Sequence, residues 1–217
     1  MILLERADVL VVDKPPGVTV IPARGEPPEA CLRAQLEAQR AERLFVVHRL
    51  DRDTSGVLVF ARNEAAHRTL SMAFAGHEVE KGYLAWVAGA LEPETGTIDL
   101  PLHEARKGKV RPAAPNEAGA RAASTDYAVE KRWANATRVA LRPHTGRRHQ
   151  IRVHLRSRNA PILFDPLYGK TTFAAFTGAP TARLALHAKR LSVPGQFEVE
   201  APLPDDLRAL ETWLDAA

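Results

Sequence analysis

The residues best suited to chemistry gather in one short polar segment, 48–56, which reads His-Arg-Leu-Asp-Arg-Asp-Thr-Ser-Gly. Its two acids, Asp51 and Asp53, stand between apolar runs at 44–47 and 57–60. Loops braced by strands commonly display catalytic groups, and a carboxylate kept ionised by an opposing cation can act as a nucleophile. The same residues can also form a charged turn that satisfies its own backbone. From these residues alone, both interpretations stay open.

A second block, residues 142–158, contains six arginines and three histidines but no acid. Such a block is expected where a protein binds a polyanion, because each neutralised phosphate releases condensed counterions. A solvated basic surface would give the same pattern. His144, His149 and His154 resemble a metal-binding ladder, but a spacing of five turns them to different faces of a helix and no carboxylate accompanies them. We therefore expect no metal site.

Strands and helices of mixed order must position these two segments. Asn63 is expected to cap a helix that runs to about Ala75 and closes at Gly76. Without strict alternation of strands and helices, the pattern indicates the α+β class and one domain over 1–217. Further helices are predicted at 29–43 and 205–214, loops with short hairpin strands at 90–123, and strands at 9–12, 44–47, 56–61, 79–87, 127–133, 137–141, 161–164, 182–191 and 197–199.

The basic block predicts a helix that begins at Thr145 and ends near Ser157. On such a helix Arg148, Arg152 and Arg156, spaced four apart, share one face. Ile151 and Leu155 would pack inward on a neighbouring face. We therefore expect one side of the helix to face the core and another to face an anion.

The composition of the 217 residues, 45% hydrophobic and 26% charged with a net charge of +4, is ordinary for a globular protein. The N-terminal apolar run lacks a basic leader and the roughly 20 residues needed to span a bilayer. We therefore expect a cytoplasmic protein without membrane association. The single cysteine, Cys31, excludes a disulfide framework and a thiolate zinc site.

Several segments, in order, resemble RluA-type RNA pseudouridine synthases. The segment 48–56 resembles the family signature that carries its catalytic aspartate. Residues 81–85, Lys-Gly-Tyr-Leu-Ala, resemble the tyrosine motif, and residues 145–154, Thr-Gly-Arg-Arg-His-Gln-Ile-Arg-Val-His, resemble the arginine motif. Residues 14–17, Lys-Pro-Pro-Gly, and 165–169, Asp-Pro-Leu-Tyr-Gly, resemble two further landmarks. The resemblance spans about residues 9–190.

The resemblance implies a role for each matching residue. Asp51 would be the nucleophile and Arg152 the cation that opposes its charge. Tyr83 would stack on the flipped base and is a candidate for assisting removal of the C5 proton. Arg49 resembles the residue that fills the space left by the extruded nucleotide. The implied RNA-binding set is Arg49, Arg147, Arg148, His149 and Gln150.

The implied reaction converts uridine into pseudouridine in a stem-loop of large-subunit ribosomal RNA or of transfer RNA. This isomerisation needs neither redox equivalents nor phosphate energy, so we expect no cofactor and no bound nucleotide. The implied fold is a mixed, largely antiparallel central sheet flanked by helices and loops. We expect a monomer and, because the chain begins about eight residues before its first catalytic-domain strand, no separate N-terminal RNA-binding domain of the S4 type.

The sequence departs from the family pattern at two places, and two alternative functions remain open. Phe164 stands where the family commonly has glycine, and residues 20–22, Val-Ile-Pro, lack a histidine often found there. An RNA-binding or RNA-folding protein without turnover would share the basic cleft. A hydrolase could use Ser55, although the Gly-x-Ser-x-Gly context of such a nucleophile is missing. Residues 168–171 end like a phosphate-binding loop, but Phe164 and Pro166 exclude that motif.

Overall fold

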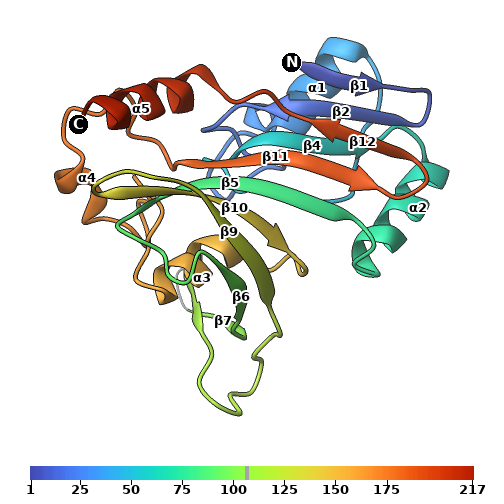
Figure 1. Cartoon of the computed structure of the whole chain (residues 1–217). Helices are drawn as coiled ribbons and strands as arrows, with labels where there is room; N and C mark the ends of the chain where they lie inside the picture. Colours follow the sequence, from blue (N-terminus) through green and yellow to red (C-terminus); the bar gives the residue numbers. More distant parts are fainter. Residues whose placement is uncertain (106–107) are drawn as a thin grey trace. The chain divides into compact units, whose positions relative to one another are not determined.

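A computed structural model describes residues 1–105 and 108–217, which form two compact units (Figure 1). The first unit contains residues 1–81 and 188–202, and the second contains 82–187 and 203–217. Strands β5 (Glu80–Ala88) and β11 (Leu186–Val193) each include a point where the chain passes from one unit to the other. The predicted α+β class is confirmed. The prediction of a single domain over 1–217 stays a prediction.

The first unit is built on antiparallel strands. β2 pairs with β1 on one side and with β4 on the other (Figure 1). β3 also pairs with β4. β12 pairs with β11. The elements of this unit are β1 (Ile2–Glu5), β2 (Val9–Lys14), the 3-10 turn η1 (Pro28–Ala30), α1 (Leu32–Arg40), β3 (Phe45–Val46), β4 (Ser55–Ala61), α2 (Glu64–Ala75) and β12 (Phe197–Glu200).

Strand β4 is packed into the core of the first unit. All seven residues of β4 are buried, and Val57, Val59 and Ala61 pack with Leu70 of α2 in one apolar cluster. Helix α2 begins as predicted, because the Asn63 side chain accepts a hydrogen bond of 2.9 Å from the Ala66 N–H. The segment that precedes β4 is therefore attached to a fully packed strand.

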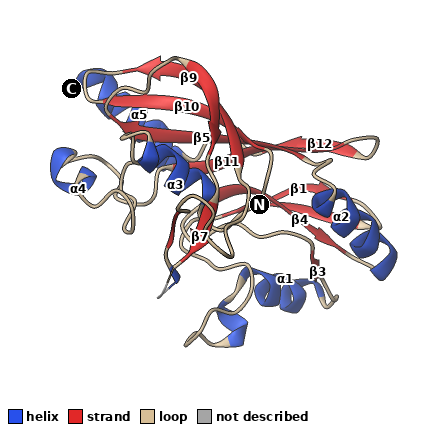
Figure 2. Cartoon of the chain, turned by 90° about the horizontal axis from the view of Figure 1, so that it is seen from below, coloured by secondary structure: helices blue, strands red, loops and turns tan. Residues whose placement is uncertain are grey.

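In the second unit the strands follow the order β5-β10-β9-β6, with antiparallel pairing throughout. Figure 2 shows the long strands β9 and β10 side by side. A separate two-stranded sheet joins β7 to β8, and α3 contacts both β8 and β10. The elements are β6 (Thr95–Asp99), β7 (Leu102–Glu104), β8 (Val110–Pro112), β9 (Ser124–Arg132), β10 (Ala136–Pro143), α3 (Gln150–Ser157), α4 (Thr172–Ala175) and α5 (Asp205–Ala216).

Most predicted elements are confirmed, but the helix predicted at 29–43 is too long. A 3-10 turn at Pro28–Ala30 precedes Cys31, which has an extended backbone conformation, and α1 begins only at Leu32. Ala41, in the left-handed conformation with φ 52°, ends the helix. Proline suits only the first turn of a helix, so the prolines at 27 and 28 favour this separate short turn.

The helix predicted from Thr145 is also wrong in its start, because α3 begins at Gln150. His149, with φ 53°, stands in the left-handed region and separates the helix from the preceding turn. The Gln150 side-chain oxygen accepts hydrogen bonds from the Thr145 hydroxyl (2.6 Å) and the Arg147 N–H (3.0 Å). These local side-chain bonds replace the first helical turn.

The strand predicted at 161–164 is reduced to one bridge between Ile162 and Val87. Phe164 then takes φ 58°, which no strand tolerates. The region 90–123, predicted as loops with short hairpin strands, includes a run of basic residues at 106–111, of which residues 106 and 107 lie outside the described part of the chain. Within that part, no helix is both long and apolar enough to cross a lipid bilayer.

Candidate active site

Asp51 lies in a tight turn between β3 and β4 of the first unit. The Thr54 N–H donates a hydrogen bond of 3.2 Å to the Asp51 carbonyl, which closes the turn. Leu50 is buried and anchors the turn, whereas the neighbouring Arg49 is exposed and the Asp51 side chain is half-buried. The turn therefore presents a carboxylate beside an exposed guanidinium, on a base fixed by apolar packing.

A buried lysine holds this turn in place. The Lys14 side chain is 0% exposed, and its ammonium group donates to the carbonyls of Pro15 (2.8 Å), Val18 (2.8 Å) and Arg52 (2.7 Å). The Gly17 N–H donates to the same Arg52 carbonyl at 2.9 Å. A buried ammonium requires such acceptors. The landmark at 14–17 thus fixes the residue that follows Asp51 and brings a positive charge to the turn.

His48 fixes the other end of the turn. Its Nε2 accepts a hydrogen bond of 3.2 Å from the Val59 N–H of β4, and its ring stacks on Phe74 of α2 at 4.5 Å. Desolvation by burial, together with the positive charge of Lys81, lowers the pKa of His48 to about 3. The imidazole is therefore neutral at pH 7, with its proton on Nδ1 because Nε2 is the acceptor.

Gly56 in β4 allows a close backbone approach that no other residue would permit. Its φ is 113°, and a Cβ built there would lie 2.1 Å from the Ala188 carbonyl oxygen. Gly56 pairs in register with Lys14 of β2. The glycine of the signature segment therefore serves the packing of the strand directly behind the turn, since only glycine fits this position without displacing the neighbouring backbone.

In the second unit, Arg152 forms a buried bidentate ion pair with Asp165. Its Nε and Nη2 donate to the two carboxylate oxygens, each at 2.8 Å, and the side chains are 4% and 0% exposed. Asp165 Oδ1 also accepts the N–H groups of Leu167 (2.8 Å) and Tyr168 (3.0 Å). Such a fork fixes the plane of the guanidinium group.

The face predicted for the arginines of α3 is wrong. Gln150 and Arg152, as well as Ile151 and Leu155, are buried, so the first turns of α3 are enclosed on all sides. Arg148 precedes the helix and is exposed, and its guanidinium lies against Gly108, where a Cβ would meet Nη2 at 2.9 Å. Arg148 and Arg152 therefore belong to different surroundings.

The arginine motif divides into supporting and outward-facing residues. The Gln150 amide is 4% exposed and donates to the Ser124 carbonyl (2.9 Å) and the Thr125 hydroxyl (3.0 Å). Because its oxygen also accepts two hydrogen bonds, the amide is occupied inside the protein. Arg147 is half-buried, and its Nε donates to the Ala122 carbonyl at 3.1 Å.

Tyr83 and the three histidines have separate positions. Tyr83 lies in β5 opposite Leu141 and is half-buried against the core of the second unit. His144 contacts Asp126 (2.6 Å), His149 contacts the Tyr168 hydroxyl, and His154 contacts Thr125 and the Leu100 carbonyl. Throughout residues 1–105 and 108–217, no group of three His, Cys, Asp or Glu side chains is arranged to hold a metal ion.

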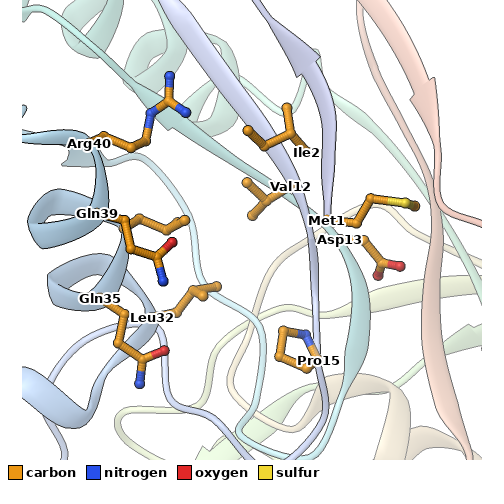
Figure 3. A pocket seen from close by; sticks show the side chains of 10 residues that line it. Met1, Ile2, Val12, Asp13, Pro15, Leu32, Gln35, Gln39 and Arg40 are labelled. Atoms are coloured by element: carbon orange, nitrogen blue, oxygen red, sulfur yellow. The ribbon is translucent and has the colours of Figure 1, made fainter.

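A pocket of about 490 Å³ in the first unit lies elsewhere, between α1 and the strands β1 and β2 (Figure 3). Ile2 and Val12 line it from the strands, and Leu32, Gln35 and Gln39 line it from α1 (Figure 3). None of the predicted site residues lines this pocket.

Comparison with known proteins decides the family. A family model described as RNA pseudouridylate synthase matches residues 8–157, a range that includes the Asp51 turn, Tyr83 and Arg152. The chain belongs to this family. It is therefore an RNA pseudouridine synthase, an isomerase, as the motifs predicted.

Individual members of the family match nearly the whole chain. Ribosomal large subunit pseudouridine synthase D of Xanthomonas campestris pv. campestris is 37% identical over 98% of this chain and 69% of its own length. Dual-specificity RNA pseudouridine synthase RluA of Salmonella typhi is 39% identical, over 89% of this chain and 86% of its own. The solved structure of human RNA pseudouridylate synthase domain containing 4 superimposes with a TM-score of 0.80 at 26% identity, covering 99% of this chain and 92% of that one.

The hydrolase alternative loses its support in this pseudouridine synthase. Ser55 is 1% exposed at the start of β4, and Nε2 of His48 is engaged by the Val59 N–H. A nucleophilic serine needs an accessible hydroxyl and a base within hydrogen-bond reach.

Sequence reasoning gave no role to Lys14 or Asp165. Both lie in segments that resemble family landmarks, and this resemblance was the only feature of the sequence that could have pointed to them. Lysine and aspartate are seldom fully buried without partners, and a sequence does not reveal which positions will be buried. Their roles emerged only from burial and hydrogen bonding.

Proposed function

We propose that this enzyme converts specific uridines of RNA into pseudouridine with Asp51 as its nucleophile and without a cofactor. Large-subunit ribosomal RNA and transfer RNA stem-loops are the proposed substrates. The names of the related synthase D and of the dual-specificity relative support a ribosomal substrate and more than one target. The observation that carries the proposal is the half-buried Asp51 carboxylate on a turn that Lys14 fixes, inside the matched region.

The proposed reaction requires an ionised carboxylate as its nucleophile. The N1 glycosidic bond of uridine breaks, the base rotates, and a new bond joins the ribose to C5, whose proton leaves to solvent. Asp51 attacks either the uracil ring or the ribose carbon in this scheme. The buried Lys14 ammonium donates to the carbonyl of Arg52, the residue after Asp51, and so holds in place the turn that carries this carboxylate.

The other roles follow the residues of the motifs. We assign to Arg152 the positive charge that opposes the nucleophile, and to Tyr83 stacking on the base and assistance in removing the C5 proton. The target nucleotide must leave its stack to be reached, and the exposed Arg49 is suited to fill the space it leaves. Arg147 and Arg148 are proposed phosphate contacts, whereas His149 and Gln150 would support the RNA-binding turn from inside.

Tritium release tests this proposal directly. RNA prepared without modification and labelled with tritium at uracil C5 is incubated with the wild-type protein, and released tritium is measured. We expect release by the wild type and none above background for Asp51→Asn, which should still bind RNA. Asp8→Asn, which changes an exposed carboxylate in the turn between β1 and β2, is the matched control and should react like the wild type.

Two outcomes would contradict the proposal. If the wild type binds and remodels RNA but releases no tritium from total ribosomal or transfer RNA, the substrate assignment fails. If Asp51→Asn releases tritium at the wild-type rate, the nucleophile is another residue.

A further inference from the structure

The Tyr168 side chain contacts two separate parts of the second unit. Its hydroxyl accepts a hydrogen bond of 2.9 Å from the Val110 N–H of β8 and lies 2.9 Å from Nδ1 of His149, the residue before α3. The His149 ring meets the Tyr168 ring edge-on at 5.6 Å. One side chain thus links the β7–β8 sheet to the start of the helix that carries Arg152.

The same residue also holds the guanidinium of Arg152 from two directions. The Arg152 Cζ lies 5.2 Å from the centroid of the Tyr168 ring, a cation–π contact. The Tyr168 N–H donates to Asp165 Oδ1 at 3.0 Å, and the same oxygen accepts Nη2 of Arg152 at 2.8 Å. The ring and the main chain of Tyr168 therefore restrict the plane in which the guanidinium lies.

The backbone around Tyr168 is shaped to keep these contacts. A Cβ at Gly169 would lie 2.5 Å from the Ile162 carbonyl oxygen, so the chain packs tightly just after the tyrosine. The Gly169 N–H donates to the Asp165 carbonyl at 3.0 Å, which closes the turn from Asp165. The carboxylate that orients Arg152 and the ring that covers it thus belong to one tight turn.

We propose that Tyr168 is a positioning residue for catalysis, which orients the Arg152 guanidinium through its ring and main chain and is itself locked by its hydroxyl. This inference rests on the proposed role of Arg152. Positioning errors of about 1 Å can reduce a rate by about 100-fold, because reaction requires aligned groups. Loss of Tyr168 should therefore reduce the rate of the reacting complex by a larger factor than it weakens RNA binding.

Two substitutions separate the ring from the hydroxyl. Tyr168→Leu removes the ring and should reduce the single-turnover rate of tritium release by about 10- to 100-fold. Tyr168→Phe keeps the ring and should reduce it by only about 2- to 5-fold, since one hydrogen-bonding group is lost. The RNA dissociation constants of both variants should change by a smaller factor than their rates, although the contact with His149 is altered. Tyr127→Phe, which removes a buried hydroxyl from β9, is the matched control and should not change the rate.

A double-mutant cycle distinguishes positioning from a general structural effect. Arg152→Lys keeps the charge but lacks the planar group that the ring covers. In that background, Tyr168→Leu should cause no further loss of rate, because the group it positions is already absent. Rates are measured where thermal unfolding shows each variant to be folded.

The inference is overturned if Tyr168→Leu keeps the wild-type rate, or if its effect multiplies fully with that of Arg152→Lys. It is also overturned if Tyr168→Leu weakens RNA binding in proportion to the rate. These results are distinct from failure of the proposed function, in which the wild type itself releases no tritium.

Discussion

His48 should make the stability of this protein depend on pH. Burial lowers its pKa to about 3, from an ordinary value of 6.5. Between these values the unfolded chain binds a proton that the folded protein does not, so the free energy of unfolding falls as the pH falls below 6.5. The contribution of the neutral His48 to the free energy of unfolding is fully present above pH 6.5 and is lost progressively as the pH falls toward 3.

The size of the effect follows from the same two values. Lowering the pH from 7 to 5 protonates His48 almost fully in the unfolded chain and hardly at all in the folded protein. The corresponding loss is at most about 2 kcal/mol, at 1.36 kcal/mol per pH unit. Because the ring is half-buried, solvent screening reduces the expected loss to about 1–2 kcal/mol.

Urea denaturation of the wild type and of His48→Gln at several pH values measures this contribution. Glutamine can accept the hydrogen bond from the Val59 N–H, but it does not titrate. The variant should be less stable than the wild type at pH 7, because it loses the stacking on Phe74. The stability difference between the two proteins should shrink by about 1–2 kcal/mol between pH 7 and pH 5. His154, whose pKa is also lowered by burial, contributes to both proteins and cancels.

His77→Asn provides the control, because His77 is an exposed histidine after α2 with φ 59°, a conformation that asparagine tolerates. Its stability should follow that of the wild type at every pH. If the curves of the wild type and His48→Gln run parallel from pH 7 to pH 5, His48 is not a neutral anchor of the Asp51 turn and the reasoning is refuted.

Two further substitutions test the supports of the site by urea unfolding. Arg152→Met leaves the buried carboxylate of Asp165 without its bidentate partner and should lower the free energy of unfolding by about 3–5 kcal/mol. Adding Asp165→Asn should restore part of this stability. Equal losses in the single and double variants would contradict the ion pair's role. Gly56→Ala places a Cβ 2.1 Å from the Ala188 carbonyl oxygen and should lower the free energy of unfolding by about 2–4 kcal/mol. Gly17→Ala, where no atom lies within 4 Å of the new Cβ, should lower it by only about 1 kcal/mol. Similar losses at both glycines would refute the close approach.

The elements whose signals are local were predictable. The cap at Asn63, the end near Gly76 and the buried strand β4 each depend on residues adjacent in the chain, and all three are confirmed. The start of α3 was not predictable in the same way. The run from Thr145 has a helical pattern, but the Gln150 side chain binds the backbone of that run and competes with the first turn.

The partner of Arg152 shows where sequence reasoning ends. The resemblance assigned its charge to Asp51, and the structure adds a buried fork to Asp165, thirteen residues along the chain. No periodicity relates these two positions, because an irregular turn separates them. Phe164, by contrast, was noticed as a departure from glycine, and its φ of 58° explains why glycine suits that position.

Burial adds a distinction that a motif match does not contain. In the arginine motif, Arg148 is exposed while Gln150 and Arg152 are buried, although all three matched the family pattern equally well. The exposed residue can meet phosphate at little cost, whereas the buried ones must satisfy their polar groups inside the protein. A match to the motif therefore does not separate these residues, and the burial and partners of each side chain show which face solvent and which are held inside the protein.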